Sequence, residues 1–156
     1  VRGSLIIVAQ NDEPRVNREN KLIREWLYKE HRTCLQWRQI RVGDVPEGAD
    51  IKFHGVLRRW ADAICYDGKV VTIFEAKMSP DPAALSQLEL YAQLFHKTPE
   101  FSEFSGKPVE LVMLTTIEDR EVRALAESKG ILFVVFNPPW VKEYWKERAA
   151  QRARAK

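Results

Sequence analysis

Two acidic residues and a lysine in one predicted β-hairpin could act together chemically in this 156-residue chain. Asp62 lies in the first strand-like run, and Glu75 and Lys77 lie in the second. Side chains alternate along a strand with a period of two, so all three are expected on one face of the hairpin. Unpaired buried charges are costly, so these groups must be paired, hydrated or bound to a cation.

Two interpretations of this cluster are open on geometry alone. It is either a salt-bridge cluster at the sheet edge or a magnesium site, because Mg²⁺ is held by one or two carboxylates with water and substrate phosphate. Glu19, near the start of a predicted helix, is either a further ligand or an acid favoured by the helix dipole. Gln87 and Tyr91, four residues apart on a later helix, either join the site or pack against the sheet.

The turn of the hairpin sets the register of these side chains. Asp67-Gly68 is a strong signal for a two-residue turn. This turn would pair Tyr66 with Lys69 and Asp62 with Ile73, which leaves Glu75 as a diagonal neighbour of Asp62. Arg58 and Arg59 immediately precede the Asp62 strand, so their positive charges are expected near the same end of the sheet.

The remaining elements alternate in a way that predicts an α/β fold. Asn17 is a good N-cap for the first helix, and Asp81-Pro82 is a good start for the helix that follows the hairpin. Helices are expected over residues 17–31, 81–96, 118–129 and 141–153, and strands over 5–10, 34–42, the hairpin 60–77, 109–115 and 131–136. This order predicts a mixed sheet with helices on both faces.

Composition and charge limit the class of protein. A hydrophobic fraction of 45% and a charged fraction of 30% are typical of a soluble globular chain. The length predicts a single domain over residues 1–156, with its core over about residues 16–136. No apolar run is long enough for a membrane anchor, and no signal peptide is evident, so a cytoplasmic, intracellular location is expected.

The formal net charge of +3 is too small to identify a nucleic-acid-binding protein. It is unevenly distributed, because residues 142–156 contain six basic and two acidic residues and the rest of the chain is nearly neutral. This basic C-terminal helix, which includes Lys146 and Arg152, is either a solvated face or a source of phosphate contacts.

Asp62, Glu75-Ala76-Lys77 and the later Gln87-x-x-x-Tyr91 pattern together resemble the PD-(D/E)XK nuclease superfamily, within it the RecB-like members. Glu19 resembles the first-helix glutamate of that superfamily, which also occurs in archaeal Holliday-junction resolvases. The resemblance covers about residues 16–115 and implies a restriction-endonuclease-like αβββαβ core. Ala61 departs from the pattern, because a proline often precedes the aspartate.

The resemblance also implies a mechanism and a set of residues. Asp62, Glu75 and the Ala76 carbonyl, with Glu19, would bind Mg²⁺ or Mn²⁺. Lys77 would orient the attacking water, and Gln87 and Tyr91 would support the site. Contacts with DNA are assigned to four basic residues: Arg58, Arg59, Lys146 and Arg152. With only Cys34 and Cys65 available, no four-cysteine iron–sulfur cluster is expected.

The function implied is a Mg²⁺-dependent deoxyribonuclease, either an endonuclease or an exonuclease, acting in DNA repair, recombination or the processing of phage and mobile elements. A Holliday-junction resolvase is one subtype. Cutting both strands of a duplex or junction requires two active sites, which is consistent with a homodimer. Two alternatives are a catalytically silent DNA-binding or assembly subunit on the same fold, and a structural domain whose charges form ion pairs.

Overall fold

The computed structural model describes residues 7–8, 17–45, 48 and 58–156. The helices are α1 (Arg18–Glu30), α3 (Pro82–Phe95), α4 (Arg120–Ser128) and α5 (Pro139–Arg154), with a short 3₁₀ helix, η1 (Pro99–Phe104). The strands are β1 (Ile7–Val8), β2 (Leu35–Val42), β3 (Arg59–Tyr66), β4 (Val71–Lys77), β5 (Val109–Thr115) and β6 (Leu132–Val135). The predicted order of helices and strands is confirmed over the described residues, and η1 was not predicted. Residues 5–6 and 9–10 of the predicted first strand lie outside the described residues.

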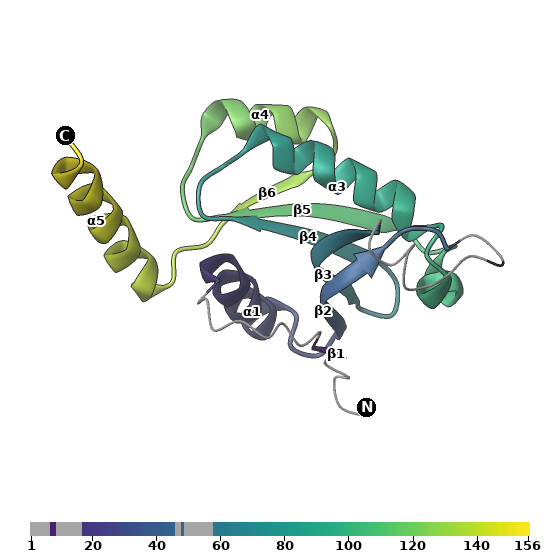
Figure 1. Ribbon diagram of the computed structural model, residues 1–156. Coiled ribbons are helices and arrows are strands. Elements are labelled where there is room, and N and C mark those ends of the chain that lie inside the picture. Colours follow the sequence, from purple (N-terminus) through teal and green to yellow (C-terminus); the bar gives the residue numbers. More distant parts are fainter. Residues whose placement is uncertain (1–6, 9–16, 46–47, 49–57) are drawn as a thin grey trace.

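The six strands form one mixed sheet in the order β1-β2-β3-β4-β5-β6. β2, β3 and β4 are antiparallel neighbours, whereas β4, β5 and β6 run parallel and β1 runs parallel to β2. Parallel neighbours need a crossover connection, which α3 and α4 supply. The predicted mixed sheet is therefore correct, and β4, β5 and β6 all end at the same edge (Figure 1).

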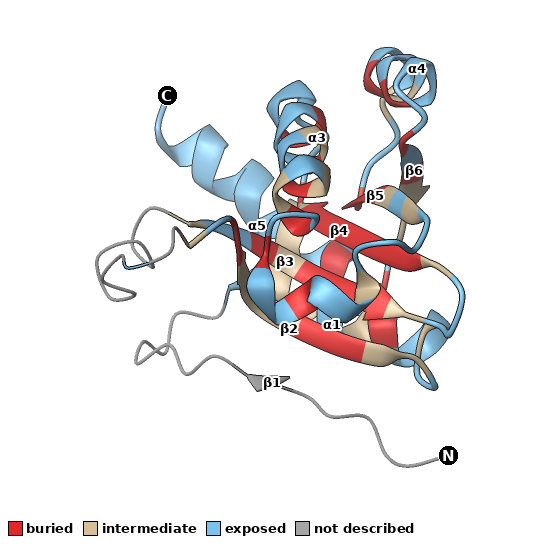
Figure 2. Ribbon diagram, turned by 90° about the vertical axis from the view of Figure 1, so that its right-hand side faces the viewer, coloured by how far each residue is buried: buried red, intermediate tan, exposed pale blue. Residues whose placement is uncertain are grey.

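Helices cover both faces of this sheet, as predicted. Figure 1 shows α3 and α4 on one face and α1 on the other. The α3 face carries a core that includes Leu88 and Phe95 packed on Ile73, and the α1 face carries one that includes Leu22 and Phe74. Because both faces of β4 are covered, six of its seven residues are buried (Figure 2). A charged side chain that is buried in β4 therefore costs free energy unless it is paired, hydrated or bound to a cation.

The two helices nearest the hairpin begin at the predicted caps. The side chain of Asn17 accepts hydrogen bonds from the backbone N–H groups of Glu19 and Asn20 at the start of α1. The side chain of Asp81 accepts one from Ala83, and Pro82 occupies the first turn of α3. Both caps satisfy backbone donors that a helix leaves unpaired, so the start of each helix is fixed relative to the sheet.

The predicted hairpin turn is wrong in its length. Asp67 accepts hydrogen bonds through Oδ1 from the backbone N–H groups of both Lys69 and Val70, each at 2.8 Å. This capping closes a four-residue loop, so Tyr66 pairs with Val71 instead of Lys69, and Ile64 pairs with Ile73. The true register differs from the predicted one by two residues. Side chains alternate with a period of two, so the predicted face of each residue is unchanged.

The last helix, α5, extends away from the sheet at the edge where β4, β5 and β6 end (Figure 1). It is two residues longer at its start than predicted, because Pro139 occupies its first turn. Val141 is its one fully buried residue, and its second half is exposed throughout (Figure 2). Within the described part of the chain, no helix is long and apolar enough to cross a membrane.

Candidate active site

The site begins where the pairing between β3 and β4 ends. The antiparallel ladder stops at Ala63 and Phe74, and beyond that point β4 pairs with β5 only. The backbone N–H of Ala76 donates a hydrogen bond of 2.7 Å to Oδ2 of Asp62. A side-chain carboxylate thus takes the place of a backbone acceptor, and Asp62 is held beside the section of β4 that carries Glu75 and Lys77.

A distortion in β2 lies opposite Asp62. Gln39 falls between the paired residues Arg38–Ala63 and Ile40–Ala61, and its φ is +49°. It is the one non-glycine residue with positive φ in the described part of the chain. Such a conformation is strained for a residue with a side chain. The Gln39 amide donates a hydrogen bond to Oδ1 of Asn20 in α1, so β2 and the first turns of α1 are joined at this point.

Glu75 and Lys77 form an ion pair within the site. Nζ of Lys77 lies 3.5 Å from Oε1 of Glu75. Glu75 is only 5% exposed, whereas Lys77 is partly exposed. The second oxygen of Glu75, Oε2, is buried and has no hydrogen-bond partner among the described residues. A carboxylate oxygen left in this way is expensive unless a cation or substrate satisfies it.

The negative charges in the site raise one another's pKa values. Burial, followed by the charge of Asp62, raises the pKa of Glu75, and Lys77 opposes this shift. Burial also raises the pKa of Asp62, against the hydrogen bond from Ala76. For Lys77, burial acts to lower the pKa, but the charges of Glu19, Glu75 and Asp62 raise it overall. Lys77 therefore stays protonated while the carboxylates compete for a proton.

Glu19 lies in the first turn of α1 and is partly buried. Its charge contributes to the raised pKa values of Asp62, Glu75 and Lys77, which places it near the three of them. Among the described residues, however, no three His, Cys, Asp or Glu side chains converge closely enough to form a metal-binding group. The structure therefore brings Asp62 and Glu75 together, with Glu19 as a neighbouring charge.

The two predicted residues on α3 differ in their environments. Its side chain is buried, and its pKa is raised by burial and then by the charges of Glu75 and Asp62. Gln87 lies one turn earlier, and its side chain is exposed. The i, i+4 spacing predicts a shared helix face, and the structure gives the two residues different environments, with Gln87 exposed and Tyr91 buried.

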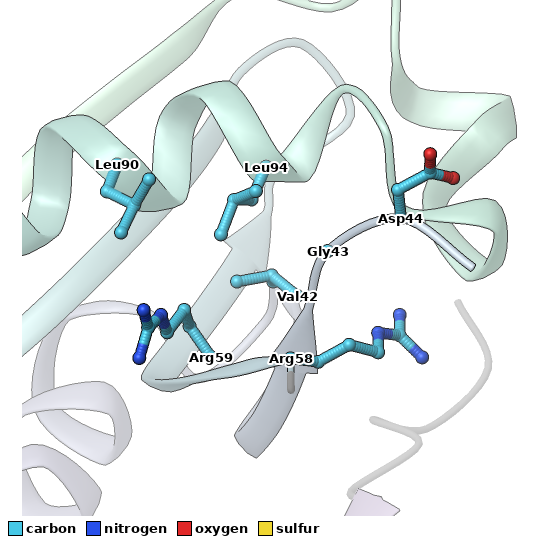
Figure 3. A pocket seen from close by; sticks show the side chains of 7 residues that line it. All are labelled: Val42, Gly43, Asp44, Arg58, Arg59, Leu90 and Leu94. Carbon is cyan, nitrogen blue, oxygen red and sulfur yellow. The ribbon is translucent and has the colours of Figure 1, made fainter. Parts of the chain in front are cut away.

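Arg58 and Arg59 lie next to the site but differ in environment. Both line a shallow pocket of about 270 Å³ between α3 and the ends of β2 and β3, and they point in opposite directions (Figure 3). Arg58 is largely buried and donates two hydrogen bonds to the carboxylate of Glu100, at 2.8 and 2.6 Å. Arg59 is exposed, and its charge lowers the pKa of Tyr91. Arg59 is thus the more accessible of the two to a phosphate.

The other two predicted DNA-binding residues, Lys146 and Arg152, lie on α5 and are exposed. Lys146 is 3.4 Å from Glu143, in an ion pair between two exposed side chains. Such pairs contribute little to stability, so Lys146 is free to exchange partners. Sequence patterns alone did not indicate Gln39, because a polar residue in a strand carries no signal for a positive φ.

The architecture has parallels among solved structures. A repair endonuclease from Pyrococcus abyssi superposes with a TM-score of 0.51 and 16% identity over 84% of this chain and 50% of that one. The fold is restriction-endonuclease-like. An EndoMS–double-stranded DNA complex matches more weakly, with a TM-score of 0.48 and 15% identity over 85% of this chain. This chain therefore spans half the length of each of these two proteins. No family model and no curated protein matches the sequence.

Proposed function

We propose that this protein is a metal-dependent nuclease of the RecB-like PD-(D/E)XK type that hydrolyses phosphodiester bonds in DNA. One observation carries the proposal: the buried Glu75 carboxylate lies with Asp62 and Lys77 at the split end of a hairpin, and one of its oxygens has no partner. The ion pair with Lys77 uses only Oε1 of Glu75, so Oε2 remains available to a cation or a substrate. The restriction-endonuclease-like fold supports the same assignment.

The donor set fits a hard divalent cation. Mg²⁺ and Mn²⁺ prefer oxygen ligands and are commonly held by one or two carboxylates, with water and phosphate completing the shell. Asp62 and Glu75, with the carbonyl of Ala76, would hold the ion, and Glu19 would add negative charge from α1. The absence of a third converging acid among the described residues is consistent with a site that water and substrate complete. A bound cation would offset charge on the phosphate and make water more acidic.

Lys77 supplies the second part of the chemistry. Its raised pKa keeps the ammonium charged at neutral pH, so it can donate hydrogen bonds to the attacking water and to a phosphate oxygen. The water oxygen forms a new bond to phosphorus and releases a proton, the bond to one ester oxygen breaks, and the departing oxygen takes up a proton, so that no net proton is gained or lost. Burial and the charges of Glu75 and Asp62 raise the pKa of Tyr91, so it would stay a neutral phenol able to donate a hydrogen bond.

The substrate proposed is DNA, as the restriction-endonuclease-like fold suggests, and a phosphodiester near this site would also meet the exposed Arg59. Gln87 is placed at the exposed surface of α3, where it would contact the strand rather than the cation. Arg58 would contribute through its ion pair with Glu100, which fixes the start of β3. Cutting of both strands would require two such sites, as a homodimer supplies.

The experiment that tests the function is a cleavage assay. Supercoiled, linear, single-stranded and four-way-junction DNA are incubated with the protein in Mg²⁺, Mn²⁺ or EDTA. Glu75→Gln and Lys77→Ala are compared with Glu110→Gln and Lys69→Ala, which make the same changes at exposed positions of β5 and the hairpin loop. We expect metal-dependent cleavage that the first two variants lose and the two controls retain.

The outcomes separate the alternatives. Binding of DNA without cleavage of any substrate in either metal would favour a catalytically silent subunit. Selective cleavage of the four-way junction would assign the protein to the Holliday-junction resolvases. A protein that neither binds nor cleaves DNA would favour the alternative that the charged residues of the site form structural ion pairs. Cleavage that persists in EDTA or in Glu75→Gln would contradict the proposed mechanism.

A further inference from the structure

Helix α5 is fixed to the body of the protein at the edge that carries the candidate site. The indole N–H of Trp145 donates a hydrogen bond of 3.0 Å to Oγ1 of Thr116. Thr116 directly follows the last residue of β5, Thr115, which pairs with Lys77. The indole N–H of Trp140 donates one of 2.6 Å to Glu25 of α1. The start of α5 is therefore anchored on both β5 and α1.

The first turn of α1 provides a third attachment. The guanidinium of Arg18 lies 4.6 Å from the centre of the Tyr144 ring and forms an ion pair of 3.6 Å with Glu147. Arg18 is the neighbour of Glu19, whose charge acts on the site. Glu147 of α5 is thus turned toward α1. These contacts fix the direction of the helix as it leaves the body.

The half of α5 that follows these contacts carries unbalanced positive charge. From residue 148 onward every residue is exposed, and no acidic residue remains (Figure 2). In this half, Arg148 and Arg152 are four residues apart and share one side of the helix. Lys142 and Lys146, in the first half, share a second side that is about 120° away around the helix axis. From Lys142 to Arg152 the helix rises about 15 Å, comparable with the rise of about four base pairs of DNA.

We infer that α5 is a rigid arm that binds the phosphate backbone of duplex DNA beside the active site. This inference deepens the proposed function and rests on it for the choice of partner. The basic residues are long side chains on a fixed helix, and the polyphosphate backbone is the partner that matches their charge and spacing. The arm holds the duplex at the edge of the sheet where β4 ends, so the scissile phosphate is delivered toward Glu75 and Lys77. It supplies affinity without sequence preference.

The test measures binding and cleavage separately. The double variant Lys146→Gln/Arg152→Gln is compared with Lys97→Gln/Lys107→Gln. The control removes two exposed charges, Lys97 just after α3 and Lys107 just before β5; Lys77 pairs with Thr115 at the other end of β5. The affinity for a duplex of about 20 base pairs is measured in EDTA by fluorescence anisotropy over about 50–200 mM salt. All proteins carry Glu75→Gln, so the measurement is independent of catalysis.

Each lost phosphate contact lowers the slope of log affinity against log salt by about 0.9. We therefore expect the arm variant to lose about two units of slope, and the control to retain the original slope. Equal losses of slope in both double variants, or no loss of slope in either, would refute the proposal that α5 binds DNA. Binding to phosphatidylserine vesicles with none to the duplex would also overturn it. Arm-dependent duplex binding by a protein that never cleaves DNA would support the arm while refuting the nuclease.

Discussion

Substitution of Glu75 by glutamine is expected to stabilise the metal-free protein while abolishing cleavage. Glu75 is buried in β4, and its oxygen Oε2 has no partner among the described residues. Burial and the charge of Asp62 raise the pKa of Glu75 from 4.5 to about 8. A raised carboxyl pKa means that the folded state holds the proton more tightly than the unfolded state does. Stability from this group is therefore greatest below pH 4.5 and is lost as the pH rises toward 8.

The size of the effect follows from that shift. At about 1.4 kcal/mol per pKa unit, the charged carboxylate destabilises the folded state by about 4 kcal/mol at pH 8. An amide at the same position removes this cost but leaves Lys77 without its ion pair and still buries a polar group, which together cost about 2 kcal/mol. We expect Glu75→Gln to raise the free energy of unfolding by about 2 kcal/mol at pH 8.

Urea denaturation in EDTA at pH 5 and pH 8 measures this effect. At pH 5, Glu75 is already protonated in the folded protein, so the stabilisation should disappear or reverse. Glu110→Gln makes the same change at an exposed position of the neighbouring strand and should alter stability by less than about 0.5 kcal/mol at either pH. A Glu75→Gln protein that is less stable than the original at pH 8, or equally shifted at both values, would refute the reasoning.

Three further outcomes are expected. Mg²⁺ should raise the melting temperature more at pH 8 than at pH 6, because the cation displaces a proton held by Asp62 and Glu75; an equal rise at both pH values would contradict proton displacement. Lys77→Ala should reduce the rate of cleavage by about 10²-fold or more, with an unchanged Kd for DNA in EDTA; a rise in Kd alone would make Lys77 a binding residue. Asp67→Ala should lower the free energy of unfolding by about 1–2 kcal/mol, because two backbone N–H groups lose their acceptor, and an unchanged urea midpoint would be the contrary result.

Periodicity was sufficient to predict the elements and the faces of the hairpin, but not its register. Asp67-Gly68 correctly placed the turn, and the alternation correctly put Asp62 and Glu75 on one face. The loop is longer than predicted because the Asp67 carboxylate accepts hydrogen bonds from the N–H groups of Lys69 and Val70. The two-residue and four-residue turns differ little in local propensity, so the sequence does not distinguish them. An error of one residue would have reversed the faces, whereas the actual error of two did not.

The parts of the site that depend on tertiary contacts could not be predicted. Gln39 takes its positive φ opposite Asp62, where its side chain is hydrogen-bonded to α1, and no sequence pattern encodes such a contact. The pairing of Arg58 with Glu100 joins residues that are 42 positions apart, so an arginine predicted as a DNA contact is largely buried instead. The tryptophans of α5, in contrast, pack against the body as their amphipathic character favours.

The hydrogen bond between Ala76 and Asp62 has a further consequence for spectroscopy. The Ala76 amide directly follows Glu75, and it is hydrogen-bonded to the titratable side chain of Asp62 instead of to the backbone of a neighbouring strand. Its proton chemical shift should follow the ionisation of Asp62, whereas the amides of the paired strands should not. Its rate of exchange with solvent should change when Asp62 turns toward a ligand, even if the sheet is undisturbed. The NMR signal of this one backbone amide thus reports the charge state of Asp62, and it can be measured in the absence of substrate and catalysis.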